Sequence, residues 1–422
     1  MVSPHATDQS KPRRLSGLMG SRKPSMKPPP QFKLTHGFDM RVIKGEDRYL
    51  VSDLGALYPN AMLYLICDGH SGGEAAEYVC TSLERDLKLQ LAEELRVYDP
   101  TSHPALVTFA ERLRTIISEL FVEIDNSWNK TGNMAGTTVT LCLVIGGLIT
   151  VANLGDSVAL LDTGCSILEL TDPHRIETHV GERARLEALG CTIAKLGFHL
   201  QGPAKPGEPG VGPTRIWPGG LCVSRSVGDL DGGPHIVPLP HIKQVLAPHQ
   251  GCRMIVASDG LWDVTSYSRA IKISRAKVGK EAACALVETV LRDQRFNDDT
   301  SVIVVDILPP DQPSFPNLAL QLGLHPVMQE RQKKPSGLCA CFAPAVEELD
   351  AQSCQGMPGH LALLADVDML VPFAREHGES ALARTSLTLR AAAAVRAETA
   401  SATGKPKDYA VHRGSEYNWG VW

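Results

Sequence analysis

The stretch LYLICDGHSGG, residues 63–73, changes character abruptly at Asp68. The residues before it form a short apolar run rich in Leu, Ile and Tyr, which is typical of a buried strand. After it come His70 and three glycines, and a turn would explain the glycines but not a carboxylate and an imidazole so close together. Because an ionised Asp at the end of a buried strand is costly unless its charge is compensated, we expect a compensating group near Asp68.

Acidic residues also lie at the ends of other apolar runs. Strands of packed sheets bring their ends to a common rim, where several carboxylates repel one another and raise one another's pKa. A divalent cation removes that conflict, and all-oxygen ligands favour Mg²⁺ or Mn²⁺ over zinc. The further acidic positions are Asp156 and Asp259 after apolar runs, Asp298–Asp299 at the start of one, and Glu46–Asp47 before a short strand-like run.

Each site alone has a simpler explanation, because Asp-Gly is a good turn sequence and a histidine at a turn is usually only solvated. Repetition at four such positions favours a metal centre instead. A glycine beside the Asp lets its backbone carbonyl approach a metal, and two neighbouring ions hold a bridging water, lower its pKa and clamp a phosphate. In such a centre the His70 imidazole could protonate a leaving alkoxide.

Hydrophobic periodicity predicts a mixed domain over residues 32–308. Apolar positions that recur every three or four residues predict helices, and closely spaced strand-like runs from 139 to 161 predict an antiparallel meander. Strands mixed with helix pairs indicate an α+β fold whose sheets are covered by helices. The predicted helices are 74–97, 105–128, 182–189, 266–278 and 280–293, and the predicted strands are 62–67, 139–145, 148–153, 158–161, 254–257 and 301–308.

Other segments differ in composition. Residues 1–31 are basic and rich in Ser and Pro, which predicts a disordered arm, with an organelle transit peptide as the alternative. Residues 309–422 begin with a Pro-rich linker and continue as a less regular tail of unknown function, partly helical in the Ala-rich stretch 379–401. Within the domain, the Gly- and Pro-rich residues 201–213 predict a mobile surface loop.

The numbers for the whole chain argue against several classes of protein. The 422 residues are 43% apolar and 21% charged, as in a globular protein whose core needs no disulfides. The net charge of −5 gives no reason to expect nucleic acid, and no apolar stretch approaches the ~20 residues that span a bilayer. The 11 cysteines form no CxxC pair, which argues against zinc and suits reduced thiols in the cytoplasm, the nucleus or both.

Across residues 36–308 the chain resembles the metal-dependent (type 2C) Ser/Thr protein phosphatases. Each motif alone is weak, but all of them in the family's order are specific, and several are similar to those of a plant-type branch. The resemblance implies a four-layer α-β-β-α sandwich of two antiparallel sheets, with helices outside and metals at one rim. The motifs are Glu46–Asp47, Asp68–Gly73, Gly136–Thr138, Asn153–Ser157, Leu221–Asp229, Ser258–Asp263 and Asn297–Val302.

The resemblance also implies roles for individual residues. His70 and Asp68 would be catalytic, with His70 as the general acid, and residues 171–225 would form a flap that borders the active site and shapes substrate choice. Two Mg²⁺ or Mn²⁺ ions are expected, with a weaker third. The implied metal ligands are Asp68, which bridges two ions, the Gly69 carbonyl on the first, Asp259 and Asp298 on the second, Glu46 through water, and Asp156 on the third.

Two positions depart from the family pattern. Many members carry an Arg four residues before the Glu, where it holds the phosphate; this chain has Val42 there, so Arg41 or Lys44 is the candidate phosphate-binding residue. The usual Asp-Asn pair is Asp298 and Asp299 in this chain. Asp298 is the expected ligand, while the extra charge of Asp299 could tighten the metal site or reorient a ligand.

The implied function is hydrolysis of phosphoserine and phosphothreonine in proteins by a metal-bridged hydroxide, with no phosphoenzyme. Phosphorylated proteins are the expected partners, without nucleic acid or membrane, and the family suggests a monomer. The cysteines offer no rival nucleophile, since Cys67 lacks a CxxxxxR phosphate loop. The alternatives are a pseudophosphatase or regulatory protein that binds phosphoproteins without turnover, and a scaffold whose function lies in the basic arm and the tail.

Overall fold

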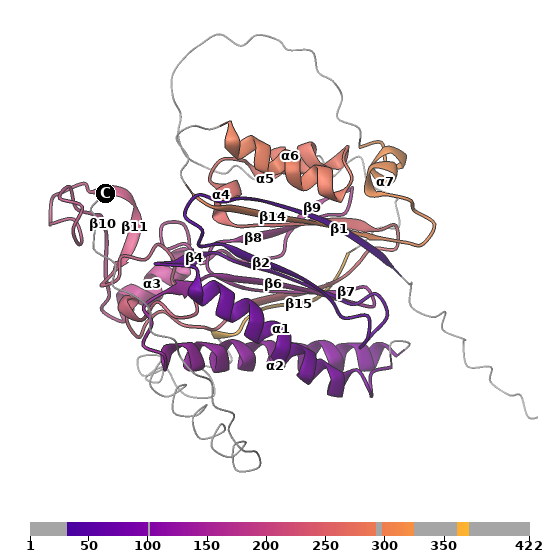
Figure 1. Cartoon of the computed structure of the whole chain (residues 1–422), viewed down its shortest axis with the longest axis horizontal. Coiled ribbons are helices and arrows are strands. Elements are labelled where there is room, and N and C mark those ends of the chain that lie inside the picture. Colours follow the sequence, from indigo (N-terminus) through magenta and orange to yellow (C-terminus); the bar gives the residue numbers. More distant parts are fainter. Residues whose placement is uncertain (1–31, 100–101, 293–297, 325–360, 371–422) are drawn as a thin grey trace, which may run out of the picture.

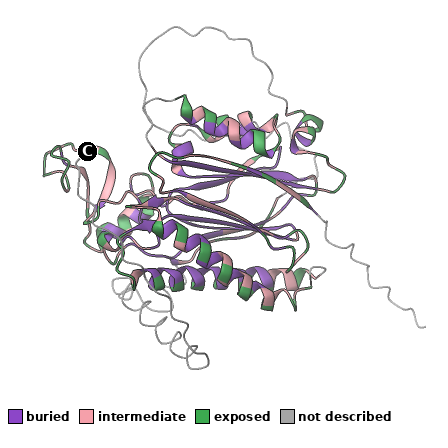
Figure 2. Cartoon of the chain, in the orientation of Figure 1, coloured by how far each residue is buried: buried purple, intermediate pink, exposed green. Residues whose placement is uncertain are grey.

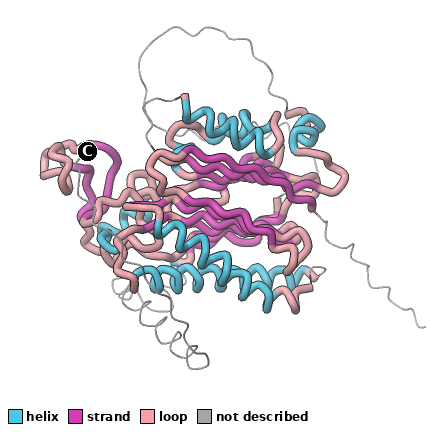
Figure 3. The backbone as a smooth tube through the Cα atoms, viewed as in Figure 1, coloured by secondary structure: helices cyan, strands magenta, loops and turns pink. Residues whose placement is uncertain are grey.

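The computed structural model describes residues 32–99, 102–292, 298–324 and 361–370. These residues form two antiparallel sheets that lie face to face, with helices on both outer surfaces (Figure 1). Figure 3 shows the resulting layers, two of strands between two of helices. The α+β sandwich that the sequence predicts is therefore confirmed.

The two sheets take their strands from widely separated parts of the chain. The six-stranded sheet has the order β15-β12-β7-β6-β3-β2, and the five-stranded sheet has the order β1-β14-β13-β8-β9. The short pairs β4-β5 and β10-β11 lie at one end of the sandwich (Figure 1). The strands are β1 (Lys33–Arg41), β2 (Arg48–Asp53), β3 (Met62–Cys67), β4 (Gly69–His70), β5 (Gly136–Thr137), β6 (Val139–Ile145), β7 (Leu148–Leu154), β8 (Val158–Asp162), β9 (Ile167–Glu169), β10 (Thr192–Leu196), β11 (Val211–Trp217), β12 (His241–Leu246), β13 (Cys252–Ala257), β14 (Thr300–Leu308) and β15 (Ala362–Asp368).

Helices cover both outer faces. α1 (Glu74–Glu94) and α2 (His103–Asn129) lie along the six-stranded sheet, whereas α5 (Tyr267–Arg275) and α6 (Gly279–Leu291) lie on the five-stranded sheet (Figure 1). The long helices predicted from periodicity are confirmed, with ends shifted by a few residues. The remaining helices are α3 (Val180–Ala188), α4 (Asp259–Trp262), α7 (Phe315–Gln321) and the 3-10 turn η1 (Leu230–Gly232).

β3 shows why the opening stretch is apolar at every position. Leu63 and Leu65 belong to the core between the six-stranded sheet and helices α1 and α2, while Tyr64 and Ile66 belong to the core between the two sheets. Alternate side chains of a strand point to opposite faces, so a strand covered on both sides needs apolar residues throughout. Figure 2 shows buried residues along the strands of both sheets.

The predicted meander from 139 to 161 is wrong at its last strand. β6 and β7 form a hairpin in the six-stranded sheet, but β8 pairs with β13 in the other sheet. The other edge of β7 is occupied by β12, so β8 cannot pair there. The chain crosses between the sheets at Gly155, which has a φ of +91°. Any Cβ at this position would lie 2.4 Å from the Thr138 side chain, so the crossing requires glycine.

The folded part extends beyond the predicted domain end at residue 308. α7 packs through Phe315 and Leu318 against Leu308. β15 pairs with β12 and becomes an edge strand of the six-stranded sheet. The prolines after Leu308 end β14, as predicted, but they do not end the fold. The residues beyond them cover an apolar surface at Leu308 and the free edge of β12.

The predicted mobile loop at 201–213 is also partly regular. Its last residues begin β11, which pairs with β10 to form a hairpin in the flap. The predictions for 1–31 and 379–401 fall outside the described residues. Among the helices of the described residues, none is long and apolar enough to cross a membrane.

Candidate active site

The acidic residues predicted at strand ends gather at one edge of the sandwich. The end of β3 pairs with the start of β2, and the end of β13 pairs with the start of β14. Because both pairs are antiparallel, the residues after one strand lie beside those before its partner. We call four of these residues the acidic rim: Asp68 after β3, Asp156 after β7, Asp259 after β13 and Asp298 before β14.

The carboxylates of the acidic rim perturb one another. Burial, followed by the charges of Asp47 and Asp259, raises the pKa of Asp68 well above its usual value. Burial and the Asp156 charge raise the pKa of Asp259 to about 8. Burial also raises the pKa of Asp156, against the opposing charge of Arg175. Negative charge is therefore in excess at the rim, which is the electrostatic condition for binding a cation.

The two candidate phosphate-binding residues lie in different places. Lys44 reaches the rim, where its Nζ atom is 2.8 Å from the Asp298 carboxylate. Burial would lower the pKa of Lys44, but the hydrogen bond to Asp298 raises it. Arg41 instead directs Nη1 to the carbonyl oxygen of Val290 in α6, 3.5 Å away. Within the described residues, Lys44 is thus the candidate that contacts the acidic rim.

Arg175 is a cation at the rim that the sequence patterns did not reveal. Its guanidinium lies 2.5 Å from Asp263, 3.6 Å from Asp156 and 3.7 Å from Asp259. Burial would lower the pKa of Arg175, but the Asp263 hydrogen bond and the rim charges raise it. The contact with Asp263 joins residues 88 positions apart, so no local pattern could have shown it.

The donor atoms of the rim fit hard divalent cations. They are carboxylate oxygens, together with the Gly69 carbonyl. Residue 69 must be glycine, because a Cβ there would lie 2.5 Å from the Glu46 carbonyl oxygen. In the described part of the chain, no three His, Cys, Asp or Glu side chains are already arranged to hold an ion. Lys44 and Arg175 lie among the carboxylates instead and compensate part of their charge.

His70 is held by a carboxylate to which the sequence assigned no role. Its Nδ1 atom lies 2.9 Å from Asp229 Oδ2, across 159 positions of sequence. Asp229 is 2% exposed, has a left-handed φ of 51°, and lies so close to Gly136 that a Cβ there would be 2.1 Å from its carboxyl carbon. Burial would lower the pKa of His70, but Asp229 raises it to about 9. The raised pKa favours the protonated imidazole at neutral pH.

Asp299 contacts the loop before β2. Its Oδ1 atom accepts hydrogen bonds from the N–H groups of Ile43 at 2.5 Å and Lys44 at 2.8 Å. Its Oδ2 atom accepts those of Glu46 at 2.6 Å and Asp47 at 3.1 Å. Burial would raise the pKa of Asp299, but these backbone groups lower it to about 2. Asp299 thus fixes the loop that carries Lys44 and Glu46.

Glu46 and Asp47 point to different sides of this loop. Glu46 Oε1 accepts the N–H of Gly72 at 2.8 Å. Asp47 is buried, and its Oδ2 atom accepts hydrogen bonds from the hydroxyls of Ser258 at 2.9 Å and Ser301 at 2.8 Å. Burial raises the pKa of Asp47 to about 6. Asp47 therefore joins the two strand pairs, a structural role that its motif alone did not reveal.

The comparison with known families agrees with this geometry. The family model described as "Protein phosphatase 2C" matches residues 46–301. This chain belongs to the protein phosphatase 2C family. The matched span contains the whole acidic rim, together with His70, Arg175 and Asp229.

Several curated relatives come from plants, which agrees with the plant-type branch that the motifs implied. The chain is 38% identical over 272 residues to "Probable protein phosphatase 2C 5" of Arabidopsis thaliana, covering 63% of this chain and 60% of that protein. It is also 38% identical over 254 residues to "Probable protein phosphatase 2C 3" of Oryza sativa subsp. japonica, covering 59% of this chain and 48% of that protein. The match thus spans less than two thirds of either relative.

Solved structures share the fold. The crystal structure of serine-threonine phosphatase 2C from Toxoplasma gondii gives a TM-score of 0.54 at 22% identity, covering 66% of this chain and 97% of that one. A C. elegans sex determining protein gives a TM-score of 0.52 at 21% identity, covering 68% of this chain and 67% of that one. At these identities the likeness shows the fold alone.

Proposed function

We propose that this member of the protein phosphatase 2C family hydrolyses phosphoserine and phosphothreonine in proteins and requires Mg²⁺ or Mn²⁺. The observation that carries the proposal is the acidic rim, in which burial and neighbouring carboxylates raise the pKa of Asp68 and of Asp259. His70, beside it, has a pKa raised by Asp229. Ionisable groups perturbed this strongly by burial and neighbouring charges are typical of functional sites.

Two divalent cations and a weaker third are proposed for these residues. When bound, the ions would neutralise the rim, lower the pKa of a water molecule and offset charge on the phosphoryl oxygens. Lys44, now paired with Asp298, would become available to a phosphate once Asp298 has a cation as its partner. The proposed holders are Asp68 and the Gly69 carbonyl for the first ion, Asp68, Asp259 and Asp298 for the second, Glu46 through water, and Asp156 for the third.

His70 supplies a proton to the leaving group in this proposal. Serine and threonine oxygens are poor leaving groups as alkoxides, so protonation at this atom lowers the barrier. The contact between Nδ1 and Asp229 holds the ring in one orientation. The environment of Cys67, the residue before Asp68, supports attack by water without a phosphoenzyme. A hydrogen bond with Cys80 and burial raise the pKa of the Cys67 thiol well above the usual value, so this thiol does not serve as a nucleophile.

Binding of phosphoproteins without turnover is the second candidate, and it is favoured by Val42 at the position of the family's phosphate-binding Arg. A phosphothreonine peptide labelled with ³²P separates the two. With Mn²⁺ we expect the label to appear as inorganic phosphate, and none on protein precipitated by acid. Peptide binding without release would support the second candidate, and labelled protein would contradict direct attack by water.

The remaining parts of the proposal concern partners and location. Phosphorylated proteins are the proposed substrates, and the resemblance supports a monomer. The scattered single cysteines support a reducing compartment, the cytoplasm or the nucleus. An affinity-purified sample at known concentration, examined by light scattering, tests the monomer: a mass near twice the chain's 45.5 kDa would contradict it.

A further inference from the structure

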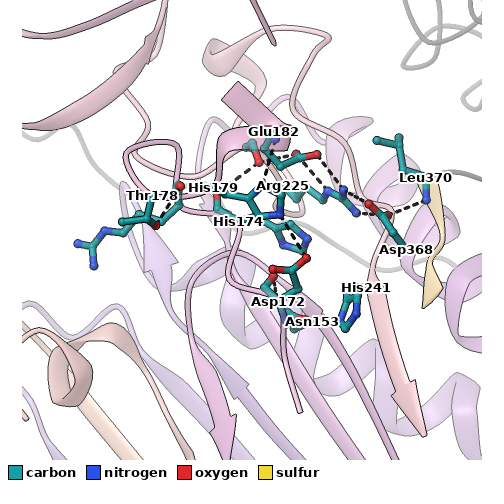
Figure 4. Close-up of polar contacts among 12 residues, drawn as sticks. Asn153, Asp172, His174, Thr178, His179, Glu182, Arg225, His241, Asp368 and Leu370 are labelled. Carbon is teal, nitrogen blue, oxygen red and sulfur yellow. Dashed lines mark hydrogen bonds and ion pairs between the residues drawn. The ribbon is translucent and has the colours of Figure 1, made fainter. Parts of the chain in front are cut away.

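β15 brings a partly exposed carboxylate, Asp368, whose side chain is 32% exposed, against a buried guanidinium at the base of the flap. Asp368, the last residue of β15, pairs with Arg225 through two contacts of 2.7 Å. The Arg225 side chain is 0% exposed, and its Nη2 atom also donates to Glu182 of α3 at 2.8 Å. Figure 4 shows Arg225 between these two carboxylates.

Asp368 supplies one of the two carboxylates that pair with the guanidinium groups of this cluster. Arg185 also pairs with Glu182, at 2.8 Å, so the cluster contains two guanidinium groups and two carboxylates. Among the described residues, the ion pairs of Arg225 are those with Glu182 and Asp368. Loss of Asp368 would leave the buried Arg225 with Glu182 as its remaining ion-pair partner among the described residues, and Glu182 is shared with Arg185, which is unfavourable.

β15 also contains an acidic residue that serves as an internal comparison. Asp366 lies 2.9 Å from Lys243 and 2.6 Å from His241, both on β12. Its side chain is 42% exposed. Asp366 therefore helps to hold β15 on the sheet but makes no contact with the flap cluster in the described residues, which allows strand docking to be separated from the effect on Arg225.

Arg225 is connected to the acidic rim on one side. The preceding residue, Ser224, donates its N–H to the carbonyl oxygen of His174 at 3.0 Å. The residue after His174 is Arg175, the cation that lies among the rim carboxylates. A shift of Arg225 therefore moves the backbone that places Arg175.

The chain after Arg225 reaches His70. Val227 and Thr137 exchange two backbone hydrogen bonds of 3.0 and 2.9 Å. Two residues later, Asp229 holds the imidazole of His70. The segment 222–229 thus touches the site at both ends, and Arg225 is the residue that anchors its middle in the buried cluster.

We infer that Asp368 is a positioning residue: through Arg225 it fixes the segment 222–229, and so keeps Arg175 and the Asp229–His70 pair in place. The structural part of this inference stands on the contacts alone. Its catalytic part rests on the proposed function. The C-terminal strand β15 then contributes to the active site through Asp368, although it lies beyond the span that matches the family model.

Amide hydrogen exchange tests the structural part without any need for activity. Asp368→Asn removes the charge but keeps the shape of the side chain, and Asp366→Asn is the matched control on the same strand. We expect exchange in segments 179–189 and 222–229 to be about tenfold faster in Asp368→Asn, unchanged in Asp366→Asn, and close to wild type in Asp368→Glu. Equal exchange in Asp368→Asn and the wild type, or equal acceleration in both Asn variants, would overturn the inference.

A comparison of two substrates tests the catalytic part. 4-Nitrophenolate leaves easily without a proton, so displacement of His70 should affect its release less than release of threonine. With Mn²⁺ we expect Asp368→Asn to lower kcat/KM for a phosphothreonine peptide by about tenfold, and for 4-nitrophenyl phosphate by no more than about twofold. An equal fall for both substrates would overturn the positioning of the Asp229–His70 pair by Asp368. If the wild type hydrolyses neither substrate, the proposed function fails, and hydrogen exchange still decides the structural part.

Discussion

The carboxylate of Asp299 accepts backbone N–H groups on both of its oxygens. One oxygen accepts hydrogen bonds from the N–H groups of Ile43 and Lys44, and the other accepts those of Glu46 and Asp47. An amide in the same place has one acceptor oxygen and one donating nitrogen, so it satisfies only half of these donors. The chemistry of this residue therefore decides how firmly the loop before β2 is held.

We predict that Asp299→Asn lowers the free energy of unfolding by about 1–3 kcal/mol, because it leaves partly buried N–H groups, and the buried one of Asp47, without a full set of acceptors. Urea unfolding measures the difference. Asp53→Asn is the control, since Asp53 is exposed and accepts one N–H, that of Gly55, at 2.6 Å. The control should change stability by no more than about 0.5 kcal/mol. An Asp299→Asn protein as stable as the wild type would show that the loop does not depend on this carboxylate.

His70 gives a second prediction at this scale. His70→Asn should lower kcat for a phosphoserine peptide about 10²–10⁴-fold, the usual contribution of a general acid, and affect 4-nitrophenyl phosphate less. Calorimetric titration with Mn²⁺ is the control, because the imidazole is not among the proposed metal ligands. A similar loss for both substrates, with unchanged metal affinity, would contradict the role of His70 as a proton donor.

Residues with a local pattern could be predicted, and residues whose role depends on a distant partner could not. Asp68 and Asp259 stand out because each follows an apolar run, which is visible in adjacent residues. Asp229 ends a motif, but its partner His70 lies 159 positions away. Asp368 lies in a stretch without any motif, and its contact with Arg225 exists only because β15 docks on the sheet.

At the scale of elements, apolar runs predicted the strands that are covered on both faces. β6, β7, β8, β13 and β14 are buried at every position, so their sequences are continuously apolar or nearly so. β10, β11 and β15 are more exposed and have mixed sequences. Strand propensity depends on such neighbours, and the pattern therefore gave the fully buried strands and the edge strand β2, but missed β12 inside the six-stranded sheet, the edge strands β1, β9 and β15, and the flap hairpin.

The flap helix α3 gives a prediction about pH. Burial would raise the pKa of Glu182, but Arg225 and Arg185 hold it far below its ordinary value. A carboxylate whose pKa is lower in the folded state stabilises the fold above its unfolded pKa, and this stabilisation is lost as the pH falls. Glu182→Gln should therefore lower the free energy of unfolding by about 3–5 kcal/mol at neutral pH, because it breaks a buried ion pair.

The difference in the free energy of unfolding between Glu182→Gln and the wild type should become smaller as the pH falls through about 4, where the carboxyl group becomes protonated in the unfolded state. Urea unfolding at a series of pH values measures it. Glu187→Gln, exposed on the same helix, is the control and should show no such dependence. A difference that stays constant across this pH range would contradict the low pKa of Glu182.

At the scale of the whole molecule, the acidic rim joins the two sheets. Asp68 follows β3 in the six-stranded sheet, and Asp259 follows β13 in the five-stranded sheet. A cation held by both residues would bind only the folded state, and such a ligand at a hundredfold excess over its Kd adds about 2.7 kcal/mol of stability. Metal binding at the rim would therefore stabilise the packing of the two sheets.

We predict that Mn²⁺ raises the melting temperature of the wild type, and that EDTA reverses the rise. Asp68→Asn should not respond to Mn²⁺. Without metal it should be at least as stable as the wild type, because it removes a like charge from the rim. Differential scanning calorimetry measures both effects. An Asp68→Asn protein that Mn²⁺ stabilises as much as the wild type would place the metal elsewhere.

The decisive measurement is the initial rate of phosphate release from a phosphothreonine peptide with Mn²⁺, Mg²⁺ or excess EDTA. We expect release by the wild type with either metal, none in EDTA, and none by Asp68→Asn under any condition. A folded wild-type protein that binds Mn²⁺ but releases no phosphate, or an Asp68→Asn protein as active as the wild type, would contradict this expectation.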